Sequence, residues 1–96
     1  MRYGFHPEAE AEFVHAIDYY EGCNSGLGYD FAVEVHSTIE SLLSFPNAWT
    51  ILEDKIRRCQ IRRFPYGIVY PQDGDFIFIL AVMHLHRDPD YWKDRV

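Results

Sequence analysis

The hydrophobic pattern of the chain changes its period near residue 55. Before that point, apolar residues recur at helical spacing in two stretches. The first stretch predicts a helix over 7–21, with a stripe made of Ala9, Phe13, Ala16, Ile17 and Tyr20. The second predicts a helix over 27–45, with a stripe made of Leu27, Phe31, Val35, Ile39 and Leu42. Because few residues separate them, we expect the two helices to pack as an antiparallel hairpin.

From Lys55 onward the pattern alternates, which is typical of strands. It predicts strands over Lys55–Phe64 and Tyr66–Pro71, the second with Tyr66, Ile68 and Tyr70 on one face. A further short strand is expected at Arg2–His6, before the first helix. The intervening segment Asn47–Asp54 is predicted to be a loop.

One stretch, Phe76–Met83, holds eight residues without a polar side chain. It is too short to cross a bilayer, which needs roughly 20 apolar residues as a helix. The turn signal Asp73-Gly74 precedes it, and such a run is typical of a strand that is buried on both faces. A buried helix is the alternative, but the β-branched residues Ile77, Ile79 and Val82 favour a central strand.

These elements predict one α+β domain spanning 1–96. An N-terminal strand precedes the helical hairpin, and the hairpin packs on one face of an antiparallel sheet. The last three strands of that sheet form a meander. The segment after the run, beginning at Asp88-Pro89, is expected to turn and end in a short helical tail.

Composition and charge narrow the class of protein. The two cysteines, Cys23 and Cys59, are too few for a disulfide scaffold, and reduced thiols are favoured over a Cys23–Cys59 bond. The N-terminus lacks the apolar segment of a signal peptide, so we expect a cytoplasmic protein. Residues 1–54 hold one base and ten acids, a net charge of −9, whereas residues 55–96 hold eight bases and five acids, a net charge of +3. This asymmetry predicts one acidic and one basic face, which either bind partners or are simply solvated.

The polar residues His84, His86, Arg87 and Asp88 directly follow the apolar run, where a rigid strand would present them to solvent. The spacing His84-x-His86-x-Asp88 also matches three metal ligands on one face. A structural zinc site normally has four ligands, so we expect no metal and no cofactor. His84 can exchange protons near neutral pH, or it can be a hydrogen-bonded core residue.

Several motifs together resemble the RelE/ParE toxin superfamily, the toxins of bacterial type II toxin–antitoxin modules. They are Arg63-Phe64-Pro65-Tyr66, Val69-Tyr70, the Asp73-Gly74 turn, Ala81-Val82 and His84-x-x-Arg87-Asp88-Pro89-x-Tyr91-Trp92. The resemblance is most specific over 57–95. It implies a strand, two helices and a three-stranded meander, the same order that the periodicity predicts.

The superfamily has two branches, and the resemblance to each differs. RelE-like members cut messenger RNA at the ribosome, whereas ParE-like members inhibit DNA gyrase. The cutting branch would make Arg58, His84 and Arg87 the candidate catalytic residues. However, Gln60 stands where that branch has a lysine, and Gly67 stands where it has an arginine. The cutting branch also has a tyrosine in its C-terminal tail. The corresponding position here holds Lys93, unless Tyr91 takes the place of that tyrosine after a small shift. RNA cleavage needs proton transfer and concentrated positive charge. The differences from the cutting branch therefore favour the hypothesis of a ParE-like toxin that binds gyrase.

The resemblance also implies a cognate antitoxin, with gyrase or the ribosome and its mRNA as target and no membrane partner. The oligomeric state, a homodimer or a toxin–antitoxin hetero-oligomer, stays open. The residues expected to bind the target or antitoxin are Arg57, Arg62, Arg63, Tyr91 and Trp92. The alternatives are that the arginines are solubilising strand charges and that Tyr91 and Trp92 cap the core. For the antitoxin, the candidate surfaces are 55–63 and the exposed side of the first helix.

Overall fold

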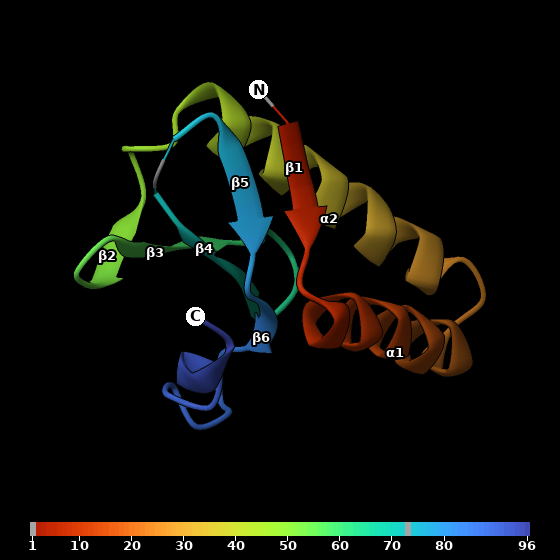
Figure 1. The fold of residues 1–96 in the computed structure, drawn as a ribbon. Helices are drawn as coiled ribbons and strands as arrows, with labels where there is room; N and C mark the ends of the chain where they lie inside the picture. The colour runs from red at the N-terminus through yellow and green to blue at the C-terminus, as the bar shows by residue number, and fades with distance from the viewer. Residues whose placement is uncertain (1, 73) are drawn as a thin grey trace.

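Two antiparallel helices form the first half of the molecule, as their apolar stripes predict (Figure 1). The computed structural model describes residues 2–72 and 74–96, and it places the helices at α1 (Pro7–Cys23) and α2 (Leu27–Ser44). Pro7 occupies the first turn of α1, and the His6 ring nitrogen Nδ1 accepts a hydrogen bond from the Glu8 N–H at 3.1 Å. Proline suits this position because its missing N–H would be unpaired there anyway.

The joint between the helices is tight. A Cβ at Gly28 would lie 2.7 Å from the Ile17 carbonyl oxygen, so only glycine allows this approach. The Glu21 carboxylate, from the last turn of α1, accepts hydrogen bonds from the N–H groups of Gly26 and Gly28 at 3.1 Å. It thereby caps the start of α2, where free N–H groups favour a negative charge.

The strands form two hydrogen-bonded sets beside the helices. Four antiparallel strands run in the order β2-β3-β4-β6, with bounds Thr50–Glu53, Ile56–Gln60, Tyr66–Pro71 and Ala81–His84. The other set pairs β1 (Arg2–Phe5) in parallel with β5 (Phe76–Ile79). The predicted α+β class and the meander of the last strands are therefore confirmed. The predicted loop Asn47–Asp54 is wrong in part, because β2 forms there and pairs with β3.

The prediction of one central strand over Phe76–Met83 is also wrong. The run divides at Leu80: β5 pairs with β1, and β6 pairs with β4 at the edge of its sheet. Phe76 and Phe78 are exposed, so only one face of β5 is buried. The division follows from the end of β1 at Phe5, after which α1 begins at Pro7. Helix α1 then lies along β6, in the place that a further strand would need.

The middle of the four-stranded sheet, around β4, is buried on both faces, whereas the edge strand β2 is largely exposed. The helices cover one face, where Phe31 and Ile39 of α2 pack against Ile68 and Tyr70 of β4. The other face carries a smaller cluster in which the fully buried Trp92 packs with Val69 and Met83. The chain reaches this second face through the segment after β6, which ends in the short 3-10 helix Lys93–Arg95. The helical tail is thus confirmed.

Two local features complete the fold. Strand β3 is shorter than the predicted Lys55–Phe64, because the chain turns after it and Arg63 adopts a positive φ of 71°. Of the predicted turn Asp73-Gly74, Asp73 lies outside the described residues, while Gly74 has a φ of 72°, which suits glycine. In the described ranges, neither helix has the length and apolar character needed to span a membrane.

Candidate functional site

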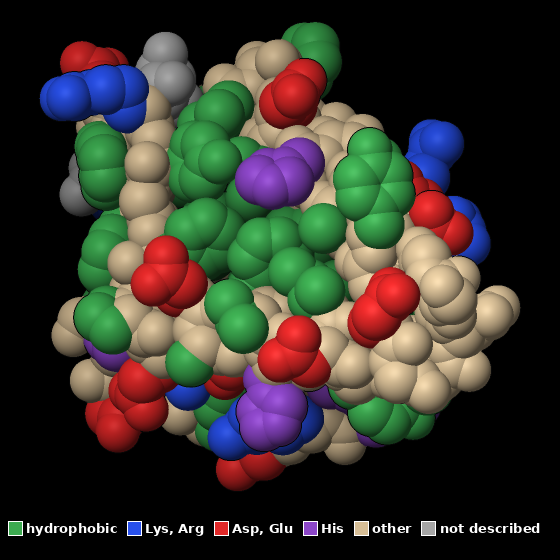
Figure 2. All heavy atoms as spheres, turned by 90° about the vertical axis from the view of Figure 1, so that its right-hand side faces the viewer, with side chains coloured by type: hydrophobic (Ala, Val, Ile, Leu, Met, Phe, Trp, Pro, Cys, Tyr) green, Lys and Arg blue, Asp and Glu red, His purple; other side chains and the backbone are tan. Residues whose placement is uncertain are grey.

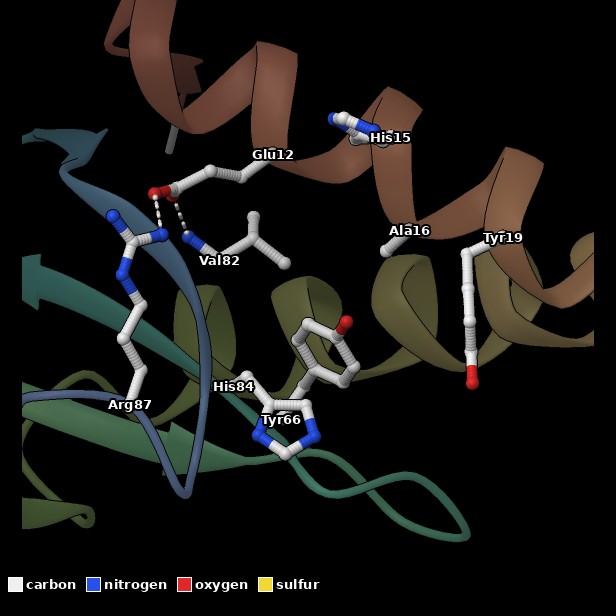
Figure 3. A pocket seen from close by; sticks show the side chains of 8 residues that line it. All are labelled: Glu12, His15, Ala16, Tyr19, Tyr66, Val82, His84 and Arg87. Carbon is white, nitrogen blue, oxygen red and sulfur yellow. Dashed lines mark hydrogen bonds and ion pairs between the residues drawn. The ribbon is translucent and has the colours of Figure 1, made fainter.

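A pocket of about 290 Å³ lies between α1 and the end of β6 (Figure 3). Four lining residues come from one side of α1, and the sheet and the segment after it supply the others. The full set is Glu12, His15, Ala16, Tyr19, Tyr66, Val82, His84 and Arg87. Two of the predicted site residues, His84 and Arg87, are therefore brought together.

Aromatic rings form the sheet side of this pocket. Tyr66 and His84 face each other across β4 and β6, with ring centroids 5.0 Å apart in a T-shaped contact. His84 Nδ1 accepts a hydrogen bond from the His86 N–H at 3.1 Å, so the neutral ring carries its proton on Nε2. Burial, more than the neighbouring Tyr19 and Glu12, raises the pKa of the Tyr66 hydroxyl. The Tyr66 hydroxyl therefore keeps its proton at neutral pH, and both this hydroxyl and the Nε2–H of His84 can donate hydrogen bonds.

Glu12 is the centre of an ion-pair network at one end of the pocket. Its side chain is 15% exposed, and Arg95 binds it with two hydrogen bonds of 3.1 and 3.0 Å. The Val82 N–H donates to the same carboxylate at 3.1 Å, and Arg87 approaches it at 3.6 Å. Arg95 also donates to the Leu80 carbonyl at 3.0 Å. The network joins α1, β6 and the C-terminal segment.

Arg87 is held by two neighbours rather than left free. Besides Glu12, it lies 3.7 Å from the centroid of the Tyr91 ring, an arrangement that favours a cation over the ring face. Burial, followed by the Glu12 carboxylate, raises the pKa of the Tyr91 hydroxyl. Within the described ranges, the ion pair of Arg87 is with Glu12 and not with Asp88, Asp90 or Asp94. Arg95, which is 7% exposed, is the residue that fastens the tail.

The third candidate catalytic residue, Arg58, lies on the other face of the sheet. It pairs with Val69 of the second core cluster, whereas His84 pairs with Tyr66 on the helix side. The stem of Arg58 covers Gly67: a Cβ there would be 2.8 Å from Arg58 Cγ and Cδ. The structure therefore does not bring Arg58 and His84 together on one face of the sheet.

The remaining predicted arginines are also dispersed. Arg57 donates to the Trp49 carbonyl and to Gln72 Oε1, both at 2.7 Å, and so holds the segment before β2 against the sheet. Arg63 pairs with Asp30 of α2 at 3.6 Å, and exposed Arg62 borders a polar hollow beside the same helix. Basic residues of the second half thus pair with acids of the first half, which weakens the predicted division into an acidic and a basic face.

The predicted binding residue Trp92 is fully buried in the second core cluster, and Tyr91 is half-buried beneath Arg87 and Arg95. This placement fits the alternative that both cap the core. The rings of His84 and His86 lie 5.4 Å apart, but residues 2–72 and 74–96 bring together no group of three metal-ligating side chains.

Sequence reasoning missed Glu12, His15, Tyr19 and Arg95. Glu12 could have been found, because it lies three residues after Ala9 and four before Ala16, within the apolar stripe of α1. A charge on a buried stripe indicates a buried partner. The partner, 83 residues further along the chain, gives no local signal.

Comparisons with known proteins agree with this fold. The model of the family described as "ParE toxin of type II toxin-antitoxin system, parDE" matches residues 3–89. Among solved structures, a chain of the chromosomal ParDE TA system from P. aeruginosa superposes with a TM-score of 0.74 at 16% sequence identity. The match covers 90% of this chain and 97% of that one. No curated protein matches the sequence significantly.

Proposed function

The chain belongs to the ParE toxin family of type II toxin–antitoxin systems, and from that premise we propose that it arrests growth by binding a protein target, DNA gyrase, in the cytoplasm. The observation that supports binding over RNA cleavage is the separation of its basic residues. Arg58 and His84 lie on opposite faces of the sheet, and the charge of Arg87 is compensated by Glu12.

RNA cleavage requires a different arrangement. A phosphate gaining negative charge is stabilised by cations that point at one place, beside a group that transfers the proton. Gly67 cannot be replaced by an arginine here unless the stem of Arg58 moves, because the two side chains would occupy the same space. The net charge of −6 also opposes binding to RNA, whose phosphates attract basic proteins.

The test is a pair of reactions with the purified protein. We expect it to inhibit supercoiling by gyrase and to leave mRNA intact in a translation reaction. The opposite result, cleaved mRNA with normal supercoiling, would establish the RelE-like alternative. The Arg58→Ala variant is the matched control, because removing a catalytic cation should lower a cleavage rate by several orders of magnitude.

The antitoxin partner is proposed to dock on the exposed side of α1. There a groove of about 690 Å³ is lined by Phe5, Phe13 and Val14, with Glu10 and Asp18 at its rim. Phe5 stacks on Phe13 at 5.8 Å, so rings from β1 and α1 form one apolar surface. Figure 2 shows hydrophobic side chains gathered on this side of the molecule, bordered by acidic ones. The proposed occupant is an antitoxin segment whose apolar residues are flanked by bases.

Binding of the antitoxin to variants tests this surface. Val14→Asp places a charge in the groove, and we expect it to weaken the complex at least tenfold without unfolding the protein, because Val14 is exposed. The control is Val33→Asp, an equally apolar and exposed position on α2 outside the lining of the groove. Equal affinities for the two variants would place the antitoxin elsewhere.

A further inference from the structure

The pocket between α1 and β6 has the lining of a site for an aromatic ring. Its floor is apolar, made by the buried side chains of Ala16 and Val82. Tyr66 and His84 form the wall from the sheet, and His15 and Tyr19 form the wall from the helix (Figure 3). The space equals that of roughly ten water molecules, enough for one ring that enters between helix and sheet.

The charges of the pocket are already paired, which limits what it can hold. Glu12 and Arg87 neutralise each other at one end, and Arg95 binds Glu12 further. An isolated phosphate or ammonium group would therefore find no unpaired counter-charge. The acidic residues of α1, among them Glu8 and Glu10, disfavour a nucleic acid.

The polar groups of the pocket wall indicate which ring is suited. The Tyr66 hydroxyl and the Nε2–H of His84 can both donate hydrogen bonds there. A ring with one polar edge can hydrogen-bond there while its apolar body lies on Ala16 and Val82. Tyrosine and tryptophan side chains have this character, and they are enriched among the residues that dominate protein–protein affinity.

We propose that this pocket binds a tyrosine or tryptophan side chain of the protein target. The inference rests on the proposed function, because it requires a protein rather than RNA as target. Tyr19 is central to it: the side chain is 63% exposed and reaches the pocket from the last turns of α1. Removing the Tyr19 side chain should therefore take away part of the helix wall with little loss of stability, because that side chain is largely exposed.

The experiment follows the NMR spectrum of the whole protein during titration with N-acetyl-tyrosinamide and N-acetyl-tryptophanamide. We expect saturable shifts confined to the residues of the pocket, including the ring signals of His15 and His84. Tyr19→Ala should weaken binding at least fivefold. Tyr29→Ala should leave it unchanged, because Tyr29 is 73% exposed on α2 and does not line the pocket. Absence of saturable shifts, or equally tight binding of adenosine or uridine monophosphate, would overturn the proposal.

Growth arrest on expression separates this inference from the function on which it rests. If Tyr19→Ala no longer binds the probes and no longer arrests growth, while Tyr29→Ala still does both, the pocket is the target site. If Tyr19→Ala no longer binds the probes but still arrests growth, the target binds elsewhere and the inference fails, although the toxin function stands. If the wild-type protein binds the probes without arresting growth, the proposed function is the part that fails.

Discussion

The two arginines on Glu12 should differ sharply in their contribution to stability. Arg95 is 7% exposed and makes two hydrogen bonds to the carboxylate, whereas Arg87 is 54% exposed and approaches it at 3.6 Å. We consider the same substitution at each position, Arg95→Met and Arg87→Met. Methionine retains much of the aliphatic stem, so the comparison isolates the charged group.

The expected magnitudes follow from burial. Removing one partner of a buried ion pair typically costs 3–5 kcal/mol, because the other charge remains buried without compensation. Glu12 would keep the Val82 N–H and Arg87, so we expect the lower end, a loss of about 3 kcal/mol for Arg95→Met. For a chain of this length that corresponds to a fall in Tm of roughly 12–24 °C. An exposed pair contributes about 1 kcal/mol or less, which is the loss expected for Arg87→Met.

Urea unfolding of both variants and the wild type measures the difference directly. The reasoning would be refuted if Arg95→Met lost less than about 1 kcal/mol, or if Arg87→Met lost as much as Arg95→Met. The double variant Glu12→Gln with Arg95→Met should lose less than the sum of the single losses, because the two residues act as one pair.

For function, cells that express Arg87→Ala should grow, with the melting temperature of the variant within a few degrees of the wild type. A folded variant that still arrests growth would remove Arg87 from the site.

Three further predictions address other parts of the molecule. Gly67→Ala should cost about 1–3 kcal/mol by urea unfolding, because its Cβ would lie 2.8 Å from the Arg58 stem; the loss should shrink in an Arg58→Ala background, and an equal loss there would show that another contact is responsible. Burial raises the pKa of the Cys59 thiol to about 11 and that of the Tyr70 hydroxyl to about 12, so the native state keeps protons that the unfolded chain releases. The free energy of unfolding should therefore be lower at about pH 10.5 than at about pH 8, and equal values would contradict the assignment. An acidic segment of the antitoxin is also expected to approach the second candidate surface, residues 55–63. Charge reversal at Arg58 and Arg62 should therefore slow association and flatten its salt dependence, as followed by stopped-flow mixing, and unchanged kinetics would exclude residues 55–63 as a docking surface.

The helices were predictable because their signal is local. The stripes of α1 and α2 repeat over several turns, and Pro7 and Pro46 limit them, so both the type and the bounds of each helix follow from neighbouring residues. The division at Leu80 was not predictable in this way. An apolar run does not show which strand pairs with which half of it, and that choice depends on where β1 ends, at Phe5, 75 residues before Leu80.

The candidate site was only partly predictable for the same reason. His84 and Arg87 follow β6 directly, and their position at its end could be read from the sequence. The face on which Arg58 lies relative to them depends on the pairing of β3 with β4 and of β4 with β6. Changing either register by one residue would exchange the faces, and no local pattern reports such a shift.

The hydrogen bonds of Glu12 and Arg95 have a consequence for self-association. A strand at the edge of a sheet offers free N–H and C=O groups, to which a strand of another molecule can add. On β6 and the residue before it, two of these groups are already occupied, the Val82 N–H by Glu12 and the Leu80 carbonyl by Arg95. Glu12 is made early in synthesis and Arg95 late, so in a growing chain the Leu80 carbonyl lacks its side-chain donor until residue 95 is in place. A chain that terminates shortly before that residue is therefore expected to self-associate more readily than the full chain.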